Sequence, residues 1–393
     1  MLMIVVLLSS LLGATGCSDD STEVTFPPVP PQESRQWLFD VYGTAANDVY
    51  VGGNLGVMYH FDGSTWTLQN MGSTAAITTI WSPLTETTMY AVGHGGRIWR
   101  NTGSGWGGME SGTTEDLFGI GSFGDNLHAV GANGTIRRMS GSTWGGTGSV
   151  MVILDENSAP TDTLSTAKDL SSIVAVNNYF LGGAFHDPRY EGVRFGINGT
   201  KGTVLAPNTV AEVTADWILR PLSGEQRIEA EWVLAMSSDP ATLSRNFLGT
   251  SEGWLFSLIR DDDGNNVWQK FYPELTEDPG AGIRDLWVDA TGNVYVVTDE
   301  GKVIYQTVDY NFTADTGSRE VLYDGPSSLV GIWAAGPDNI YFTGYIDEAV
   351  MHGVHDVGAG TFTVNQINLE FPNKSAARST LAPGYDELGR PLR

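Results

Sequence analysis

A short segment recurs seven times along this chain of 393 residues, and its spacing constrains the fold more than any other feature. The first copy, "VYVGG", is centred on Tyr50. The corresponding positions in the later copies are Tyr90, His128, Phe180, Phe247, Tyr295 and Tyr341, at successive spacings of 40, 38, 52, 67, 48 and 46 residues. Units of about 40 to 50 residues that are rich in strands and turns have the size of one four-stranded propeller blade.

Each unit shows the same order of apolar segments and turns. A first strand is expected 7 to 10 residues before the central position, as at Val41-Tyr42. The segment around the tyrosine is the second strand, and a glycine-rich turn such as "GHGG" (93–96) leads to the third. An aromatic residue such as Trp66 opens the fourth strand.

Seven units of four strands predict an all-β chain that forms a single β-propeller, with seven blades over residues 36–371. Six or eight blades remain alternatives, because the fourth and fifth units match the pattern poorly. The ring can close by packing of the first blade on the last. Alternatively, the segment "EVTF" (23–26) can add a strand to the last blade.

Composition agrees with an all-β fold and excludes one class of partner. The chain has 49 glycines, 12 tryptophans and 14 tyrosines, which suit short strands joined by tight turns. The formal net charge of -25 repels phosphate backbones, so we expect no nucleic-acid partner.

The N-terminal residues predict export and a lipid anchor. Residues 1–12 are apolar, and the run is short for a membrane span, so residues 1–16 are expected to form a signal peptide. The segment "ATGC" resembles the lipobox of bacterial lipoproteins, which implies lipidation of Cys17, the one cysteine of the chain. Ser18 follows it, which by this resemblance permits an outer-membrane location. Residues 17–35 read as a proline-rich tether.

The repeat itself also resembles a known group of proteins. The run "DVYVGGNLGVMYHFDGSTW" (48–66) looks like the repeats of bacterial WD-repeat, YVTN and BNR-like propellers, including those of photosystem II assembly-factor type. This resemblance implies the fold and says little about function. Outer-membrane assembly lipoproteins with PQQ-type repeats are a more distant likeness.

Motifs that suggest chemistry mostly fall on turns of the repeat. Ser251 lies in a G-x-S-x-G match, but the alignment places it between two strands, where a nucleophile elbow does not form. Asp261 and Asp263 offer oxygen ligands for calcium, yet they align with the turn before the fourth strand. We therefore predict no catalytic residue, no metal and no cofactor, with calcium at this turn as the alternative.

Binding residues are expected where the repeat is interrupted or where first strands face the middle of the ring. The lengthened turn at 183–195 is the candidate binding loop, with His186, Asp187, Arg189, Tyr190 and Glu191. Three polar residues on first strands are the candidate channel rim, namely Asp40, Thr79 and Asp285. The segment 372–393 is expected to be an irregular C-terminal tail.

These features together predict a lipid-anchored propeller of the bacterial cell envelope that binds a protein or a glycan without catalysis. One alternative is a surface enzyme that acts on carbohydrates, similar to sialidases. The other is an outer-membrane assembly lipoprotein with PQQ-type repeats.

Overall fold

The computed structural model describes most of the chain between residues 36 and 370. The described ranges are 36–83, 87–123, 126–146, 150–154, 160–165, 170–176, 179–185, 202–207, 217–219, 233–238, 246–251, 253–260, 266–270, 281–308, 318–346 and 348–370. Every described residue belongs to one compact unit of the chain, Ser34–Arg393. In the described residues no helix has the length and apolar character needed to cross a membrane.

The described secondary structure is almost entirely β. The first half holds β1 (Leu38–Ala45), β2 (Asp48–Gly53), β3 (Met58–Phe61), β4 (Trp66–Leu68), β5 (Ile77–Trp81), β6 (Met89–Gly93), β7 (Arg97–Asn101), β8 (Trp106–Met109), β9 (Leu117–Phe123), β10 (Asn126–Gly131), β11 (Ile136–Ser140), β12 (Thr143–Gly146), β13 (Val150–Leu154), β14 (Pro160–Ser165), β15 (Leu170–Val176) and β16 (Tyr179–Phe185). The second half holds β17 (Gly202–Pro207), β18 (Trp217–Leu219), β19 (Val233–Ser238), β20 (Asn246–Thr250), β21 (Leu255–Arg260), β22 (Asn266–Lys270), β23 (Ile283–Val288), β24 (Val294–Thr298), β25 (Lys302–Gln306), β26 (Arg319–Asp324), β27 (Leu329–Gly336), β28 (Asn339–Gly344), β29 (Ala349–Asp356) and β30 (Thr361–Asn368). Three short 3-10 helices, η1 (Asn54–Gly56), η2 (His94–Gly96) and η3 (Ala132–Gly134), complete the described elements.

The strands form six four-stranded blades, so the prediction of seven such blades is wrong. The blades are β1–β4, β5–β8, β9–β12, β19–β22, β23–β26 and β27–β30, each with its strands in chain order. One further sheet has six strands in the order β14-β13-β18-β17-β16-β15. Its β13 pairs with β18 in parallel, so the hairpin β13–β14 extends this sheet beyond a blade. The expectation of an all-β propeller with four-stranded blades is otherwise confirmed.

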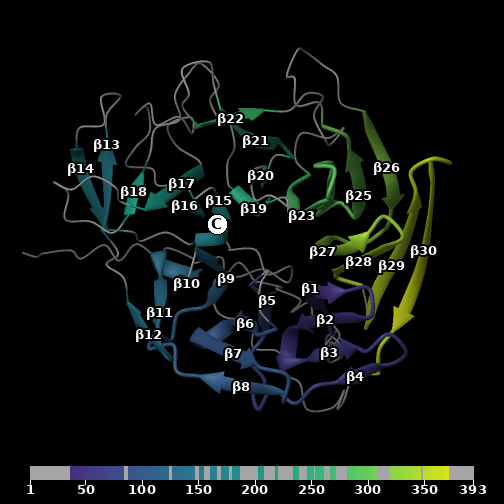
Figure 1. Cartoon of the computed structure of the whole chain (residues 1–393), viewed down its shortest axis with the longest axis horizontal. Coiled ribbons are helices and arrows are strands. Elements are labelled where there is room, and N and C mark those ends of the chain that lie inside the picture. Colours follow the sequence, from purple (N-terminus) through teal and green to yellow (C-terminus); the bar gives the residue numbers. More distant parts are fainter. Residues whose placement is uncertain are drawn as a thin grey trace, which may run out of the picture. The chain divides into compact units, whose positions relative to one another are not determined.

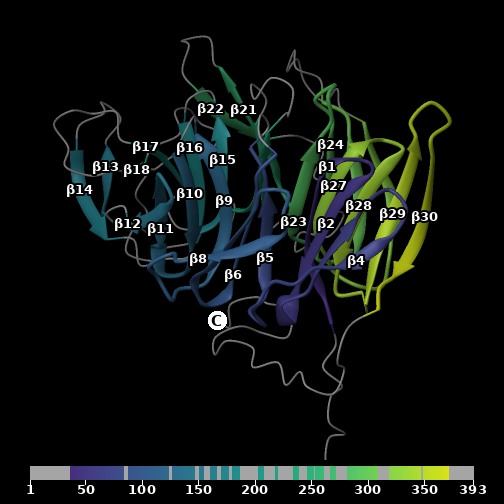
Figure 2. The same cartoon turned by 60° about the horizontal axis from the view of Figure 1, so that its bottom comes forward.

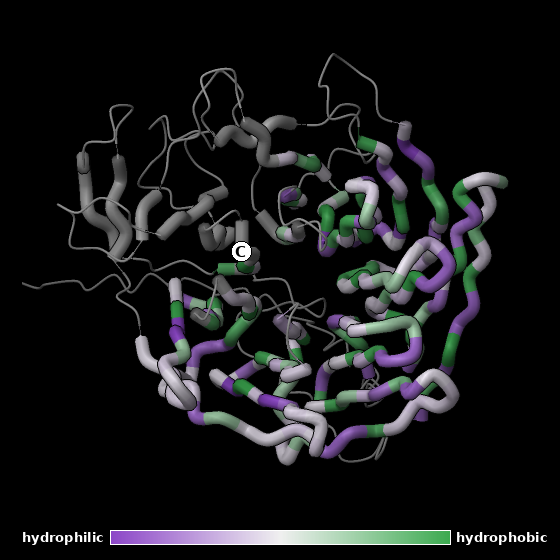
Figure 3. Tube along the Cα trace, viewed as in Figure 1, coloured by the Kyte–Doolittle hydropathy of each residue, from purple (hydrophilic) through white to green (hydrophobic). Residues whose placement is uncertain are grey.

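The first strands of the sheets lie side by side in a closed circuit (Figure 1). In this circuit β15, the first strand of the six-stranded sheet, lies between β9 and β19, and β27 returns to β1. The later strands of each sheet lie farther from the middle, and β29 and β30 form a long hairpin at the side (Figure 2). Hydrophobic residues concentrate in the inner strands, whereas the outer strands carry more hydrophilic positions (Figure 3).

Side chains between neighbouring blades make up the core. One cluster packs Tyr50 and Met58 of the first blade against Ile77 and Trp99 of the second blade. Every residue of the second strands β6 and β24 is buried, while the outer strand β30 is mostly exposed. Each blade therefore buries apolar area against both neighbours, and this burial drives the assembly of the ring.

The first and last blades, β1–β4 and β27–β30, close the circuit by packing, and they share no strand among the described residues. The ring of Trp333 lies against Gly43, where an added Cβ would come within 2.5 Å of the indole. The backbone N–H of Glu348 donates to the carbonyl of Gln36 at 3.2 Å. The segment 23–26, which could have added a strand, lies outside the described residues.

The turn after the second strand is built the same way in the first three blades. Its middle residue adopts a left-handed backbone, with φ of 58° at Leu55 and 65° at Gly95. The next residue is a glycine that is also left-handed, with φ of 69° at Gly96. A Cβ at Gly96 would lie 2.1 Å from the carbonyl oxygen of Thr113, whereas a Cβ at Gly95 would meet nothing within 4 Å. At Gly95 only the left-handed backbone disfavours a side chain, whereas at Gly96 the backbone of the next blade also leaves no room for one.

We predict that Gly96→Ala destabilises the protein more than Gly95→Ala does. Both changes impose the left-handed strain of about 1 kcal/mol, but only Gly96→Ala also pushes the Thr113 carbonyl away, at a further cost of about 1 to 3 kcal/mol. Urea unfolding of both variants measures the difference. Equal free energies of unfolding for the two variants would contradict this packing.

Candidate functional site

The three residues of the candidate channel rim occupy one structural position in different sheets. Asp40, Thr79 and Asp285 each directly precede the inward aliphatic residue of a first strand. The pairing of each first strand with its second strand shifts register at this position. Such bulges re-aim a side chain away from the regular alternation. Whether these residues border a ligand-accessible channel stays a prediction.

Each of these side chains bonds to the first strand of the next blade. Asp40 accepts the backbone N–H of Ile80 on Oδ2 at 2.6 Å. Asp285 accepts the backbone N–H of Ile332 on Oδ2 at 2.8 Å. The Thr79 hydroxyl donates to the carbonyl of the next first strand, that of Phe118, at 2.6 Å. The three residues thus fasten neighbouring blades near the middle of the ring.

The second carboxylate oxygen of each aspartate bonds within its own strand. Oδ1 of Asp40 accepts the N–H of Val41 at 2.9 Å, and Oδ1 of Asp285 accepts the N–H of Leu286 at 2.8 Å. These groups are half-buried. Each carboxylate is therefore held by two backbone donors in a fixed orientation, an arrangement that favours the charged form.

Burial acts in the opposite direction and prevails. It raises the pKa of Asp285 to about 7, although the bonds from Ile332 and Leu286 oppose the shift. It also raises the pKa of Asp40 well above its usual range, and the charge of Asp285 adds to that rise. The first strand between them, β27, carries Gly331 at the same position, so this strand places no side chain there. Near neutral pH this part of the ring can take up or release a proton.

The described part of the chain offers limited further chemistry. No group of three or more His, Cys, Asp or Glu side chains in it is placed to hold a metal ion. Ser251 lies in the turn between β20 and β21, as the repeat predicted, and a strand rather than a helix follows it. Asp62 caps the turn before β4, accepting the N–H groups of Ser64 and Thr65 at 2.9 and 2.8 Å.

Several predicted site residues lie outside the described residues. They are Cys17, the whole candidate binding loop (His186, Asp187, Arg189, Tyr190 and Glu191), Asp261 and Asp263 of the calcium alternative, and the tail 372–393.

Side-chain pairs between the second and third strands were not predicted from the sequence. Tyr50 lies opposite His60, stacked at 4.1 Å between ring centroids, and His60 Nε2 lies 2.7 Å from Asp48 Oδ1. Tyr90 lies opposite Arg100, whose guanidinium carbon is 5.9 Å from the ring centroid. A basic residue ten positions after the central tyrosine was the available signal.

A buried polar contact between the last two blades was also missed. The Tyr295 hydroxyl lies 3.0 Å from His355 Nδ1, and Glu320 Oε2 is 3.9 Å from His355 Nε2. Burial lowers the pKa of His355, which is 3% exposed. His352 on the same strand instead packs on Tyr341, at 4.7 Å between ring centroids. His355 therefore contacts the neighbouring blade, whereas His352 stacks on a residue of its own blade, and residues three apart on a strand point to opposite faces.

Comparison with known proteins identifies the fold. No protein-family model matches the sequence, and no curated protein matches it. The extracellular domain of BT4673 from B. thetaiotaomicron has a TM-score of 0.54 and 15% identity over 80% of this chain, which spans only 38% of that structure. YCF48 bound to a D1 peptide has a TM-score of 0.53 and 13% identity, over 82% of this chain and 93% of its own. An inactive virginiamycin B lyase from Staphylococcus aureus, with quinupristin, has a TM-score of 0.55 and 9% identity, over 79% and 93%. These likenesses support one conclusion, that the chain has a β-propeller fold.

We predict that stability depends on pH through Asp285. A carboxyl whose pKa is raised on folding stays protonated in the folded chain at pH values where it has already ionised in the unfolded chain. Its stabilising contribution to the free energy of unfolding is therefore complete below about pH 4 and is lost as the pH rises through about 7. Between these values the free energy of unfolding of the wild type should fall relative to Asp285→Asn, by about 4 kcal/mol over the whole range.

Urea unfolding at a series of pH values measures this slope. Asp338→Asn, an exposed aspartate in the turn after β27, is the matched control and should run parallel to the wild type. A constant difference between wild type and Asp285→Asn across the range would show that Asp285 does not titrate in this window.

Proposed function

We propose that this chain is an exported, lipid-anchored propeller of the bacterial envelope that binds a partner protein and has no catalytic role. The observation that carries the proposal is the likeness in fold to propellers solved with a bound molecule, YCF48 with a D1 peptide above all. BT4673 adds a propeller in an extracellular domain. A rigid frame with variable loops is a common platform for binding.

The state of the first-strand polar groups supports binding rather than catalysis. Asp40 and Asp285 each use both carboxylate oxygens to accept backbone N–H groups, and Thr79 donates its hydroxyl to the next blade. A catalytic acid or nucleophile needs an atom that is free to meet a substrate. These side chains hold the frame together instead.

The anchor part of the proposal rests on the sequence. The apolar start, the "ATGC" segment and the tether would leave Cys17 as the lipidated residue, outside the described range. Lipid chains on Cys17 would hold the protein at a membrane, with the outer membrane as the proposed location, where a protein or a glycan is the expected partner.

A carbohydrate-active enzyme is the second candidate, and the pKa of Asp285 favours it. A carboxyl with a pKa of about 7 has the protonation required of a general acid at neutral pH, but Asp285 would first have to release one of its two backbone donors to meet a substrate. In this case glycan turnover by the purified protein would be abolished by Asp285→Asn.

We predict that chemical cross-linking of intact cells joins the wild-type protein to a discrete envelope protein in the membrane fraction. Cys17→Ser removes the site of lipidation. The variant protein should therefore be absent from the membrane fraction and form much less of the cross-linked adduct. Ser18→Ala keeps the cysteine and serves as the matched control.

Two results would overturn the proposal. Retention of Cys17→Ser in the membrane fraction would refute the lipid anchor. Absence of any adduct with the wild type, together with glycan turnover that Asp285→Asn abolishes, would replace binding with catalysis.

A further inference from the structure

The outermost strand of the last blade, β30, has a free edge within the described part of the chain. It pairs with β29 over eight consecutive residues without a register shift, and β29 is the only described strand that is hydrogen-bonded to it. It is the longest outer strand described, since the others have three to six residues. A long and regular outer strand is a template for pairing with another chain.

The direction of its backbone groups follows from one hydrogen bond. The N–H of Leu369 donates to the carbonyl of Glu348 at 2.8 Å, so the backbone groups of Leu369 point toward the β29 side. Because antiparallel strands alternate the direction of their backbone groups, the N–H and C=O of Val364 and Gln366 point away from β29. These groups form the outward row of donors and acceptors on this edge.

Edge strands are usually protected by charge, proline or a bulge, and β30 has none of these. The other outer strands of five or more residues do carry such features. They are β22 with Lys270, β26 with Arg319, Glu320 and Asp324, and β14 with Pro160 and Asp162. The sequence of β30, "TFTVNQIN", combines high β-propensity with no charge.

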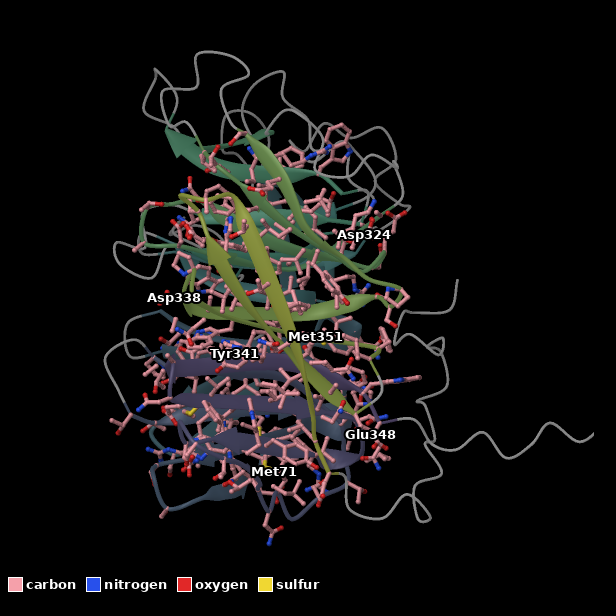
Figure 4. All side chains as sticks on the ribbon, turned by 90° about the vertical axis from the view of Figure 1, so that its right-hand side faces the viewer. Met71, Asp324, Asp338, Tyr341, Glu348 and Met351 are labelled. Carbon is pink, nitrogen blue, oxygen red and sulfur yellow. The ribbon has the colours of Figure 1, made fainter. Side chains whose placement is uncertain are left out.

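The surroundings of this edge are acidic. From residue 320 to residue 373 the sequence has seven acidic residues and no Lys or Arg. Asp324, Asp338 and Glu348 lie on the side of the protein that β29 and β30 cross (Figure 4). Asp356 and Glu370, both exposed, flank β30 at its two ends. Negative potential at both ends favours a cationic partner.

Exposed apolar side chains lie beside the same edge. Three large hydrophobic residues of the described chain are exposed, and two of them belong here. Val357 is 49% exposed in the turn between β29 and β30, and Val321 is 44% exposed on β26, which adjoins β30. A strand added to β30 can cover apolar surface at this side.

We propose that an extended, cationic peptide segment of the partner protein adds as a strand to the free edge of β30. The inference rests on the proposed binding function and identifies its surface and the chemistry of the partner. Backbone hydrogen bonds to Val364 and Gln366 hold the segment, and basic residues at its ends face Asp356 and Glu370. A second copy of this chain does not suit the edge, because each copy carries a net charge of -25 and the same acidic surroundings.

Amide hydrogen exchange on the full chain tests the site with a defined probe. The probe is a synthetic peptide of alternating Thr and Val with Lys at both ends, and a version with Glu at both ends is its control. We expect the Lys-ended peptide to slow exchange at Val364 and Gln366, and the Glu-ended peptide to have little effect. Protection on other strands, or equal effects of the two peptides, would overturn the proposal.

Substitutions at the edge separate backbone pairing from charge. Gln366→Pro removes an outward N–H and leaves the ladder to β29 intact, so affinity for the Lys-ended peptide should fall about tenfold or more, whereas Gln366→Ala should bind as the wild type does. Thr363 is exposed on β30, so Thr363→Lys should weaken binding and Thr363→Glu should not, which keeps the test valid if the proline variant unfolds.

The remaining outcomes separate this inference from the proposed function. Protection of Val364 and Gln366 without peptide, rising with protein concentration, would identify a second copy as the occupant and overturn the proposal. An envelope adduct in intact cells that Gln366→Pro and Thr363→Lys leave unchanged would refute β30 as the surface while the binding function stands. Loss of the adduct in both variants, but not in Gln366→Ala, would support the inference.

Discussion

Packing of the last blade against the first is the interaction on which the rest of the structure depends. Each blade covers the faces of its two neighbours, so an open ring would expose two apolar faces at once. Among the described residues no strand is shared across the junction, so packed side chains supply most of the contact, beside the backbone bond from Glu348 to Gln36. The cluster there joins Leu38, Val41 and Tyr59 with Tyr341 and Val350. Trp333 fills the space that Gly43 leaves open by lacking a Cβ.

The polar groups near the middle of the ring serve the same assembly. Asp40, Thr79 and Asp285 sit at bulges and reach the next first strand, so they fix the angle between neighbouring blades as well as their contact. Burial of the two aspartates has a cost, because it disfavours their charged form and raises the pKa of both. The frame is therefore most stable where these carboxyls keep their protons.

The repeat predicted the strand order within a blade because that order is local. Tyr50, the turn at 93–96 and Trp66 all occupy the expected strands or turns, since hairpins are set by short-range spacing and glycine. The blade number was wrong because the parallel pairing of β13 with β18 joins segments far apart in the sequence. No local pattern encodes such a contact. The residues of the candidate channel rim were selected by position, but their bonds between blades depend on bulges that spacing does not reveal.

Hydrogen exchange in Trp333→Ala tests most directly whether closure by packing holds the whole ring. Removing this half-buried indole should cost about 3 kcal/mol. If closure supports every blade, the slowest amides of β1, of β28 and of the remote strand β6 should lose protection by the same free energy. Loss of protection confined to β1 and β28, with β6 exchanging as in the wild type, would contradict the account and show that the blades are stable without the closed ring.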